Sequence, residues 1–101
     1  MRILNNGHTL ALIDPETENE IAAIEGHTAM LNSAILSPNG KRLVTSAEDS
    51  LIKIWDTATG LELLTIKVGA DVERTAFSPN GKILAGAVSD GTVRLWRSEG
   101  N

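Results

Sequence analysis

The sequence predicts an all-β protein built from four-stranded antiparallel sheets that recur along the chain. Three observations support this class: a stretch of sequence that returns after 41 residues, short β-rich apolar segments, and turn motifs that separate those segments. A length of 101 residues matches one small domain, so the recurring sheets belong to a single unit.

The internal repeat is clearest in two copies. The run Ser-Pro-Asn-Gly-Lys occurs twice, 41 residues apart, and aligning residues 37–56 with 78–97 gives 8 identities in 20. A fainter third copy lies upstream, where residues 20–24 match residues 62–66 at a shift of 42. Repetition with this period indicates supersecondary units that stack on their neighbours.

Each repeat is expected to contain strands, because its apolar residues alternate or form short runs bounded by turn residues. The first short strand is expected at residues 2–5. The other strands are expected, in chain order, at residues 9–13, 20–25, 33–37, 42–47, 51–56, 62–67, 74–77, 82–87 and 92–97. The repeating unit is therefore four short strands joined by three turns.

Three kinds of turn join these strands. Ser-Pro-Asn-Gly predicts a tight hairpin, because proline sets φ at the first corner and glycine tolerates the positive φ that closes the turn. Asp90-Gly91 and its counterpart Asp49-Ser50 predict a second tight connection, in which each aspartate accepts backbone N–H bonds. Residues 57–60, Thr-Ala-Thr-Gly, predict the third.

Two dipeptides carry a family resemblance. Gly26-His27 stands near the start of the central repeat and Trp55-Asp56 near its end. With the repeat length, they resemble the WD-repeat family, whose blades run about 40–45 residues. The resemblance covers nearly the whole chain and implies a partial β-propeller of four-stranded antiparallel blades.

The resemblance also divides the chain into blades. It implies an incomplete blade at residues 1–25, a complete blade at 26–67, and a last blade at 68–101 that lacks its final strand. Propellers close rings of typically four to eight blades, so such an arc exposes blade faces and an open edge strand. Two explanations are open: the chain is part of a larger propeller, or several copies complete one ring as a homo-oligomer.

Composition narrows the choice of partners. The net charge of −4 disfavours nucleic acid and anionic membranes, since both attract basic surfaces, and three aromatic residues are too few for a stacking platform. There is no cysteine and no apolar run of membrane-spanning length, so a cytoplasmic protein is expected. An acidic cluster is interpreted as a solvated face, or alternatively as a contact for a basic partner. Its members are Asp14, Glu16, Glu18, Glu20 and Glu25.

For the central blade, the resemblance implies a buried hydrogen-bond network. It runs from His27 through a hydroxyl, Thr45 or Ser46, to Asp49 and Trp55. An imidazole held between hydroxyl and indole satisfies buried donors that would otherwise cost about 1–3 kcal/mol each. A Ser-His-Asp hydrolase is the alternative, but no nucleophile turn or oxyanion loop accompanies these residues.

The last blade departs from this network. Only Asp90 and Trp96 remain, and Gly86 stands at the hydroxyl position, so we expect packing to hold this blade more than hydrogen bonds. Asp49 and Asp90 belong to separate blades and do not make a metal site. No metal, cofactor or catalytic residue is expected.

Partner binding in the resembled family commonly uses the loops at one end of the blades. Here those loops hold Thr28, Met30, Glu48, Asp71 and Val88, and an exposed Met30 and Val88 beside acids would form a mixed apolar and acidic patch. The sequence thus favours a non-catalytic scaffold that binds a protein partner. The alternatives are a self-assembling subunit that completes a ring, and an enzyme or sugar-binding protein.

Overall fold

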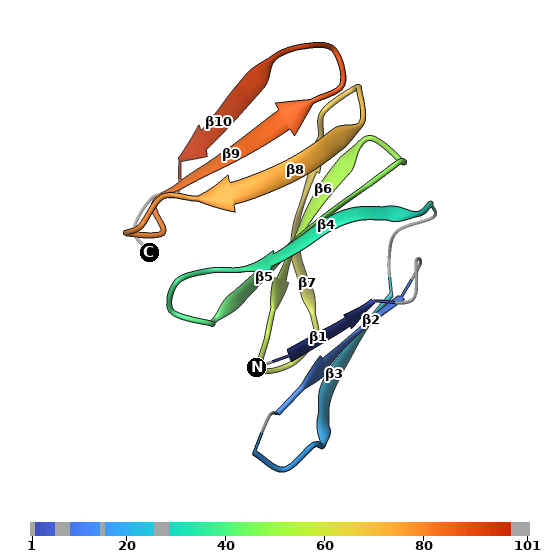
Figure 1. The fold of residues 1–101 in the computed structure, drawn as a ribbon, viewed down its shortest axis with the longest axis vertical. Helices are drawn as coiled ribbons and strands as arrows, with labels where there is room; N and C mark the ends of the chain where they lie inside the picture. Colours follow the sequence, from blue (N-terminus) through green and yellow to red (C-terminus); the bar gives the residue numbers. More distant parts are fainter. Residues whose placement is uncertain (1, 6–8, 15, 26–28, 98–101) are drawn as a thin grey trace.

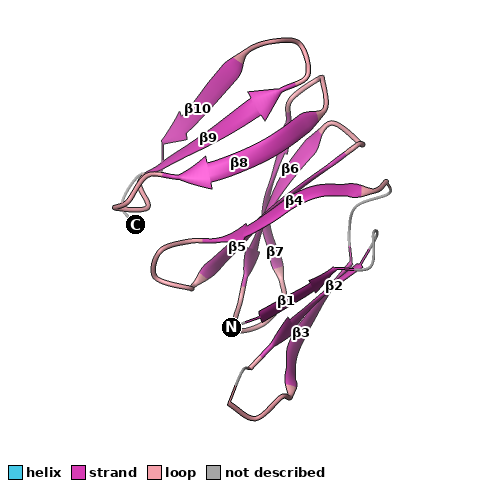
Figure 2. Ribbon diagram, viewed as in Figure 1, coloured by secondary structure: helices cyan, strands magenta, loops and turns pink. Residues whose placement is uncertain are grey.

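The computed structural model describes residues 2–5, 9–14, 16–25 and 29–97, and the regular elements of these ranges are all strands (Figure 2). The strands are β1 (Arg2–Asn5), β2 (Thr9–Ile13), β3 (Glu20–Glu25), β4 (Leu31–Leu36), β5 (Arg42–Ala47), β6 (Leu51–Asp56), β7 (Glu62–Lys67), β8 (Val72–Phe77), β9 (Ile83–Val88) and β10 (Val93–Arg97). They form three antiparallel sheets: β1-β2-β3, β4-β5-β6-β7 and β8-β9-β10, here called the first, central and last blades.

The prediction of an all-β fold with one complete and two incomplete blades is confirmed. Figure 1 shows the three sheets in succession, with the central blade between the other two. Two strand starts differ from the expected ones by two residues: β4 begins at Leu31 instead of residue 33, and β8 begins at Val72 instead of residue 74. A register shift follows the first residue of β4 and of β8, and such a bulge interrupts the alternation that sequence patterns reveal. Strands β9 and β10 each begin one residue later than expected, at Ile83 and Val93.

The two Ser-Pro-Asn-Gly turns have the same internal hydrogen bonds, as a true repeat requires. In each turn the asparagine Oδ1 accepts a bond of 2.7 Å from the serine hydroxyl and a second bond from the lysine N–H, at 2.9 Å and 3.0 Å. Gly40 and Gly81 close the turns with φ of +73°, a conformation that side chains disfavour. The predicted role of glycine in this motif is therefore confirmed.

The core lies between the blades. Leu12 of the first blade packs with Leu43 and Trp55 of the central blade. A larger cluster joins the central and last blades and contains Val44, Ile52, Val68, Val72, Leu84 and Val88. The neighbouring residues Leu43 and Val44 of β5 thus point to opposite faces of the sheet, so the central blade is apolar on both sides.

Polar contacts also join the central and last blades. Asn32 Nδ2 donates a hydrogen bond of 3.0 Å to the carbonyl of Val72. The hydroxyl of Ser33 lies 2.8 Å from that of Ser46 in its own blade and 3.2 Å from that of Thr75 in the last blade. These bonds fix the rotation of one blade against the other, which apolar packing alone defines less sharply.

The connections gather at two opposite ends of the stack, because neighbouring strands are antiparallel. The aspartate-turn end carries residues 48–50, 68–71 and 89–92. The Pro-Asn-Gly end carries residues 37–41, 57–61 and 78–82.

Candidate functional site

Polar side chains of the central blade bind one another or the backbone of their own blade. The indole Nε1 of Trp55 donates a hydrogen bond of 2.9 Å to Oγ1 of Thr45, and both residues are buried. Asp49 Oδ1 accepts the N–H of Leu51 at 3.1 Å, the turn role predicted for this aspartate. His27, the expected fourth member, lies outside the described residues. These bonds hold β5, β6 and their turn together, so the groups involved stabilise the blade.

The last blade pairs its aspartate with different partners. Asp90 accepts the N–H of Thr92 at 3.0 Å as well as its hydroxyl, and Arg94 Nη2 lies 3.0 Å from its second oxygen. The Thr92 hydroxyl, followed by the Thr92 N–H and Arg94, holds the pKa of Asp90 below its ordinary value of 3.8. Arg94 Nη1 also donates to the Val68 carbonyl at 2.8 Å, which ties the turn to the preceding loop.

Trp96 packs against the glycine that stands where the central blade has Thr45. A Cβ placed on Gly86 would lie only 2.9 Å from Cζ3 of Trp96 and 3.4 Å from Cγ1 of Val72. The ring therefore occupies the space that the threonine side chain fills in the central blade.

The aspartate-turn end brings together three of the residues proposed to bind partners. The N–H of Glu48 donates to the carbonyl of Met30 at 2.9 Å, and Met30 and Glu48 are both exposed. Asp71 is partly buried and accepts a bond of 3.2 Å from the Ser50 hydroxyl. Thr28 lies outside the described residues.

The expectation that Val88 is an exposed loop residue is wrong. Strand β9 extends to Val88, which pairs with Val72 and is buried in the cluster between the central and last blades. The alternation along β9 explains this position, since Leu84, Gly86 and Val88 are all buried and point to the same face. The same period of two was present in the sequence and would have identified it.

The acidic cluster lies on the connection between β2 and β3 and at the two ends of β3, where the side chain of Glu25 lies outside the described part of the chain. Glu16, Glu18 and Glu20 are exposed there, and Asp14 Oδ1 accepts the N–H of Glu16 at 2.9 Å. Among the described residues, no three His, Cys, Asp or Glu side chains are placed to hold a metal ion together. The same part of the chain contains no helix that is long and apolar enough to span a membrane.

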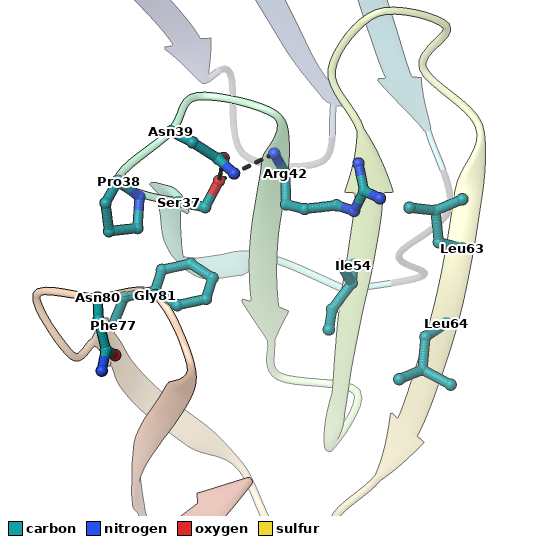
Figure 3. Close-up of a pocket in the computed structure, with 10 residues that line it drawn as sticks. All are labelled: Ser37, Pro38, Asn39, Arg42, Ile54, Leu63, Leu64, Phe77, Asn80 and Gly81. Atoms are coloured by element: carbon teal, nitrogen blue, oxygen red, sulfur yellow. Dashed lines mark hydrogen bonds between the residues drawn. The ribbon is translucent and has the colours of Figure 1, made fainter. Parts of the chain in front are cut away.

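A groove that the sequence did not reveal opens between the central and last blades at the Pro-Asn-Gly end (Figure 3). It consists of two hollows of about 310 Å³ and 450 Å³, which share Ile54, Leu64, Phe77 and Gly81. We call it the inter-blade groove. Its signal in the sequence was the leucine-rich start of β7, where more apolar residues occur than one buried face requires.

A register shift between β6 and β7 explains the leucines of this groove. The shift falls between Ile54, which pairs with Leu64, and Trp55, which pairs with Glu62, so Leu63 has no partner on β6. Leu63 and Leu64 both line the groove although they are adjacent, and they are 48% and 51% exposed. A bulge thus presents two neighbouring leucines to the same opening.

The arrangement of the sheets defines a class of protein. Antiparallel sheets of three, four and three strands, built on a 41-residue repeat and packed face to face, form a partial β-propeller. The WD40 family model, described as "WD domain, G-beta repeat", matches residues 18–56 and 63–97. The chain belongs to this family.

The chain is similar to several longer proteins over about half of its own length. It is 39% identical over 56 residues to periodic tryptophan protein 2 of Saccharomyces cerevisiae, covering 55% of the chain and 6% of the relative. It is 38% identical over 53 residues to the ribosome biogenesis protein BOP1 homolog of Leishmania braziliensis, covering 52% and 7%. The vegetative incompatibility protein HET-E-1 of Podospora anserina is 36% identical over 52 residues, covering 52% and 4%.

A solved structure has the same arrangement. The chain is similar to the crystal structure of the computationally designed Ika4 protein, with a TM-score of 0.79 and 27% identity. The match covers 96% of this chain and 61% of that one. The chain therefore spans less than two thirds of that structure and a small fraction of each relative named above.

Proposed function

We propose that the chain is a non-catalytic scaffold that binds protein partners. One observation carries the proposal: the candidate reactive side chains are already hydrogen-bonded within the blades. The hydroxyl of Thr45 and the carboxylates of Asp49 and Asp90 are all engaged in bonds within the blades. Groups committed to the fold in this way are not arranged to act on a substrate, whereas the loops and the groove between the blades are open to a partner.

The relatives support this proposal at the level of the family. WD-repeat proteins serve widely as interaction scaffolds, and one relative is named for ribosome biogenesis. A protein partner fits the net charge of −4 better than nucleic acid or an anionic membrane does. We also propose a cytoplasmic location, supported by the absence of cysteine, and fluorescence microscopy of a tagged chain tests it.

The aspartate-turn end is the proposed contact surface, and a pair of matched variants tests it. Affinity-tagged chain is cross-linked in cell extract, and captured proteins are identified by mass spectrometry. The double variant Met30→Ser, Glu48→Gln alters two exposed neighbours at this end, and Ala58→Ser alters an exposed residue at the other end. We expect capture of a defined set of proteins to fall in the double variant and to persist in Ala58→Ser. Equal capture by both variants would contradict the choice of surface.

One observation favours the alternative function, a subunit that completes a ring from several copies. β10 is the edge strand of the last blade, and its Val93 and Leu95 are 70% and 67% exposed. An edge strand with exposed apolar side chains is a template for pairing with another chain. Light scattering of the purified chain separates the two functions: self-assembly predicts a defined oligomer that Leu95→Lys disperses, and the scaffold proposal requires no such oligomer.

A further inference from the structure

The inter-blade groove has an apolar floor. Ile54 and Leu64 of the central blade and Phe77 of the last blade line both of its hollows, and Leu63 extends this surface at the Pro-Asn-Gly end. Leu63 and Leu64 are each about half exposed, so the floor is open to solvent. Covering such an apolar surface with another apolar side chain lowers the free energy of the complex.

Among the residues that the structure describes, the charged ones that line this floor are all cations. Arg42 lines the first hollow, and Figure 3 shows its side chain reaching from β5 toward Leu63 on β7. Lys82 and Arg97 line the second hollow. Of the described residues that line the two hollows, none is an aspartate or a glutamate, although the chain has a net charge of −4. The described lining of the groove is thus positively charged, whereas the chain as a whole is negatively charged.

The shape of the groove fits an extended segment. The two hollows share four lining residues, so they form one continuous depression along the junction of the blades. Their volumes, about 310 Å³ and 450 Å³, lie in the range of sites that hold several side chains or a small ligand. Apolar contacts on the floor and cations along the sides are complementary to a chain that carries apolar groups and carboxylates in alternation.

We propose that the inter-blade groove binds an extended peptide segment of a partner protein in which apolar side chains alternate with Asp or Glu. The apolar side chains cover Ile54, Leu64 and Phe77, and the carboxylates pair with Arg42, Lys82 and Arg97. The inference rests on the proposed scaffold function and names the chemistry of one partner. It adds a second contact surface, opposite the aspartate-turn end.

Fluorescence anisotropy with synthetic peptides tests the proposal. The probe is a labelled, end-capped peptide of eight residues that alternates leucine with glutamate, and the matched probe replaces each glutamate by glutamine. We expect the acidic probe to bind at least tenfold more tightly than the neutral one at low salt. The difference should shrink as sodium chloride is raised, because the ion pairs are exposed to solvent. Equal affinity for both probes would overturn the proposal.

Matched variants locate the binding. The double variant Arg42→Gln, Lys82→Gln removes two cations of the groove, and Lys67→Gln, Arg74→Gln removes one lysine and one arginine that are exposed elsewhere. Leu64→Asn alters the floor, and Leu61→Asn alters a leucine that is 65% exposed and lines neither hollow. We expect the two groove variants to weaken binding of the acidic probe about fivefold or more, and the two controls to change it less than twofold. Equal losses in groove and control variants would overturn the proposal.

The remaining outcomes separate this inference from the scaffold function and from other occupants of the groove. If the wild-type chain does not bind the acidic probe but still captures proteins in a way that depends on Met30 and Glu48, the groove proposal is overturned and the scaffold proposal remains intact. A dimer that Leu64→Asn disperses, seen by light scattering without probe binding, would assign the groove to a second copy and overturn the peptide proposal. Circular dichroism of each variant confirms the strand content.

Discussion

Replacing Thr45 by valine is expected to destabilise the chain although it makes the interior more apolar. Thr45 is fully buried, and its Oγ1 accepts the bond of 2.9 Å from the indole Nε1 of Trp55, which is 3% exposed. Valine keeps the shape of the side chain and removes the acceptor. A buried N–H that loses its partner costs about 1–3 kcal/mol, whereas an added methyl group contributes about 0.8 kcal/mol. The difference is a net loss of about 0.2–2 kcal/mol in the free energy of unfolding, with a middle value of about 1.2 kcal/mol.

Thr45→Ser provides the comparison that separates the two effects. Serine retains the hydroxyl and loses a methyl group, at a cost of about 0.8 kcal/mol. Urea unfolding, followed by circular dichroism and tryptophan fluorescence, should rank the wild type first, Thr45→Ser second and Thr45→Val last. If hydrophobic burial dominated at this position, Thr45→Val would equal or exceed the wild type, and the hydrogen-bond argument would be refuted.

Three further predictions concern the last blade and the outer edge of the central one. Gly86→Ala places a Cβ about 2.9 Å from the Trp96 ring, so we expect urea unfolding to show a loss of about 1–3 kcal/mol; an unchanged midpoint would contradict the packing. Glu62→Gln deprives the buried Lys53 ammonium of the carboxylate 2.6 Å away and should cost about 1 kcal/mol by the same measurement, whereas no loss would mean that this pair stabilises nothing. The hydrogen bonds that lower the pKa of Asp90 contribute stability above pH 3.8, and this is lost as the pH falls through the folded-state pKa. NMR titration of its carboxyl carbon should give a value below 3.8, and a value at or above it would contradict this account.

Much of the fold could be predicted because the signals are local. The alternation of apolar residues placed the strands of the central blade, and the two Ser-Pro-Asn-Gly turns form the hairpins that proline and glycine predict. The two strand starts that differ from the predicted ones by two residues, at Leu31 and Val72, lie next to bulges. A bulge depends on how two strands pair, which no single segment encodes.

The candidate site was predicted less well, because exposure is a property of packing. Met30 and Glu48 lie together at one end of the blades, where the family resemblance placed them. Val88 was assigned to a loop, but the face of the central blade covers it. The inter-blade groove was not anticipated, since its two walls come from strands that are adjacent in space and separate in the sequence.

By itself, the sequence determined the repeat, the class of secondary structure, the turns and the net charge, because each of these depends on residues close together along the chain. The tertiary structure decided which apolar side chains are covered and which cations gather around uncovered leucines. Leu43 and Val44 show the difference: both are apolar neighbours on one strand, and only the stacking of blades sends one to each side. Leu64 belongs to the same repeat and remains half exposed, because the last blade meets the central blade mainly along β4 and β5 and leaves the start of β7 open.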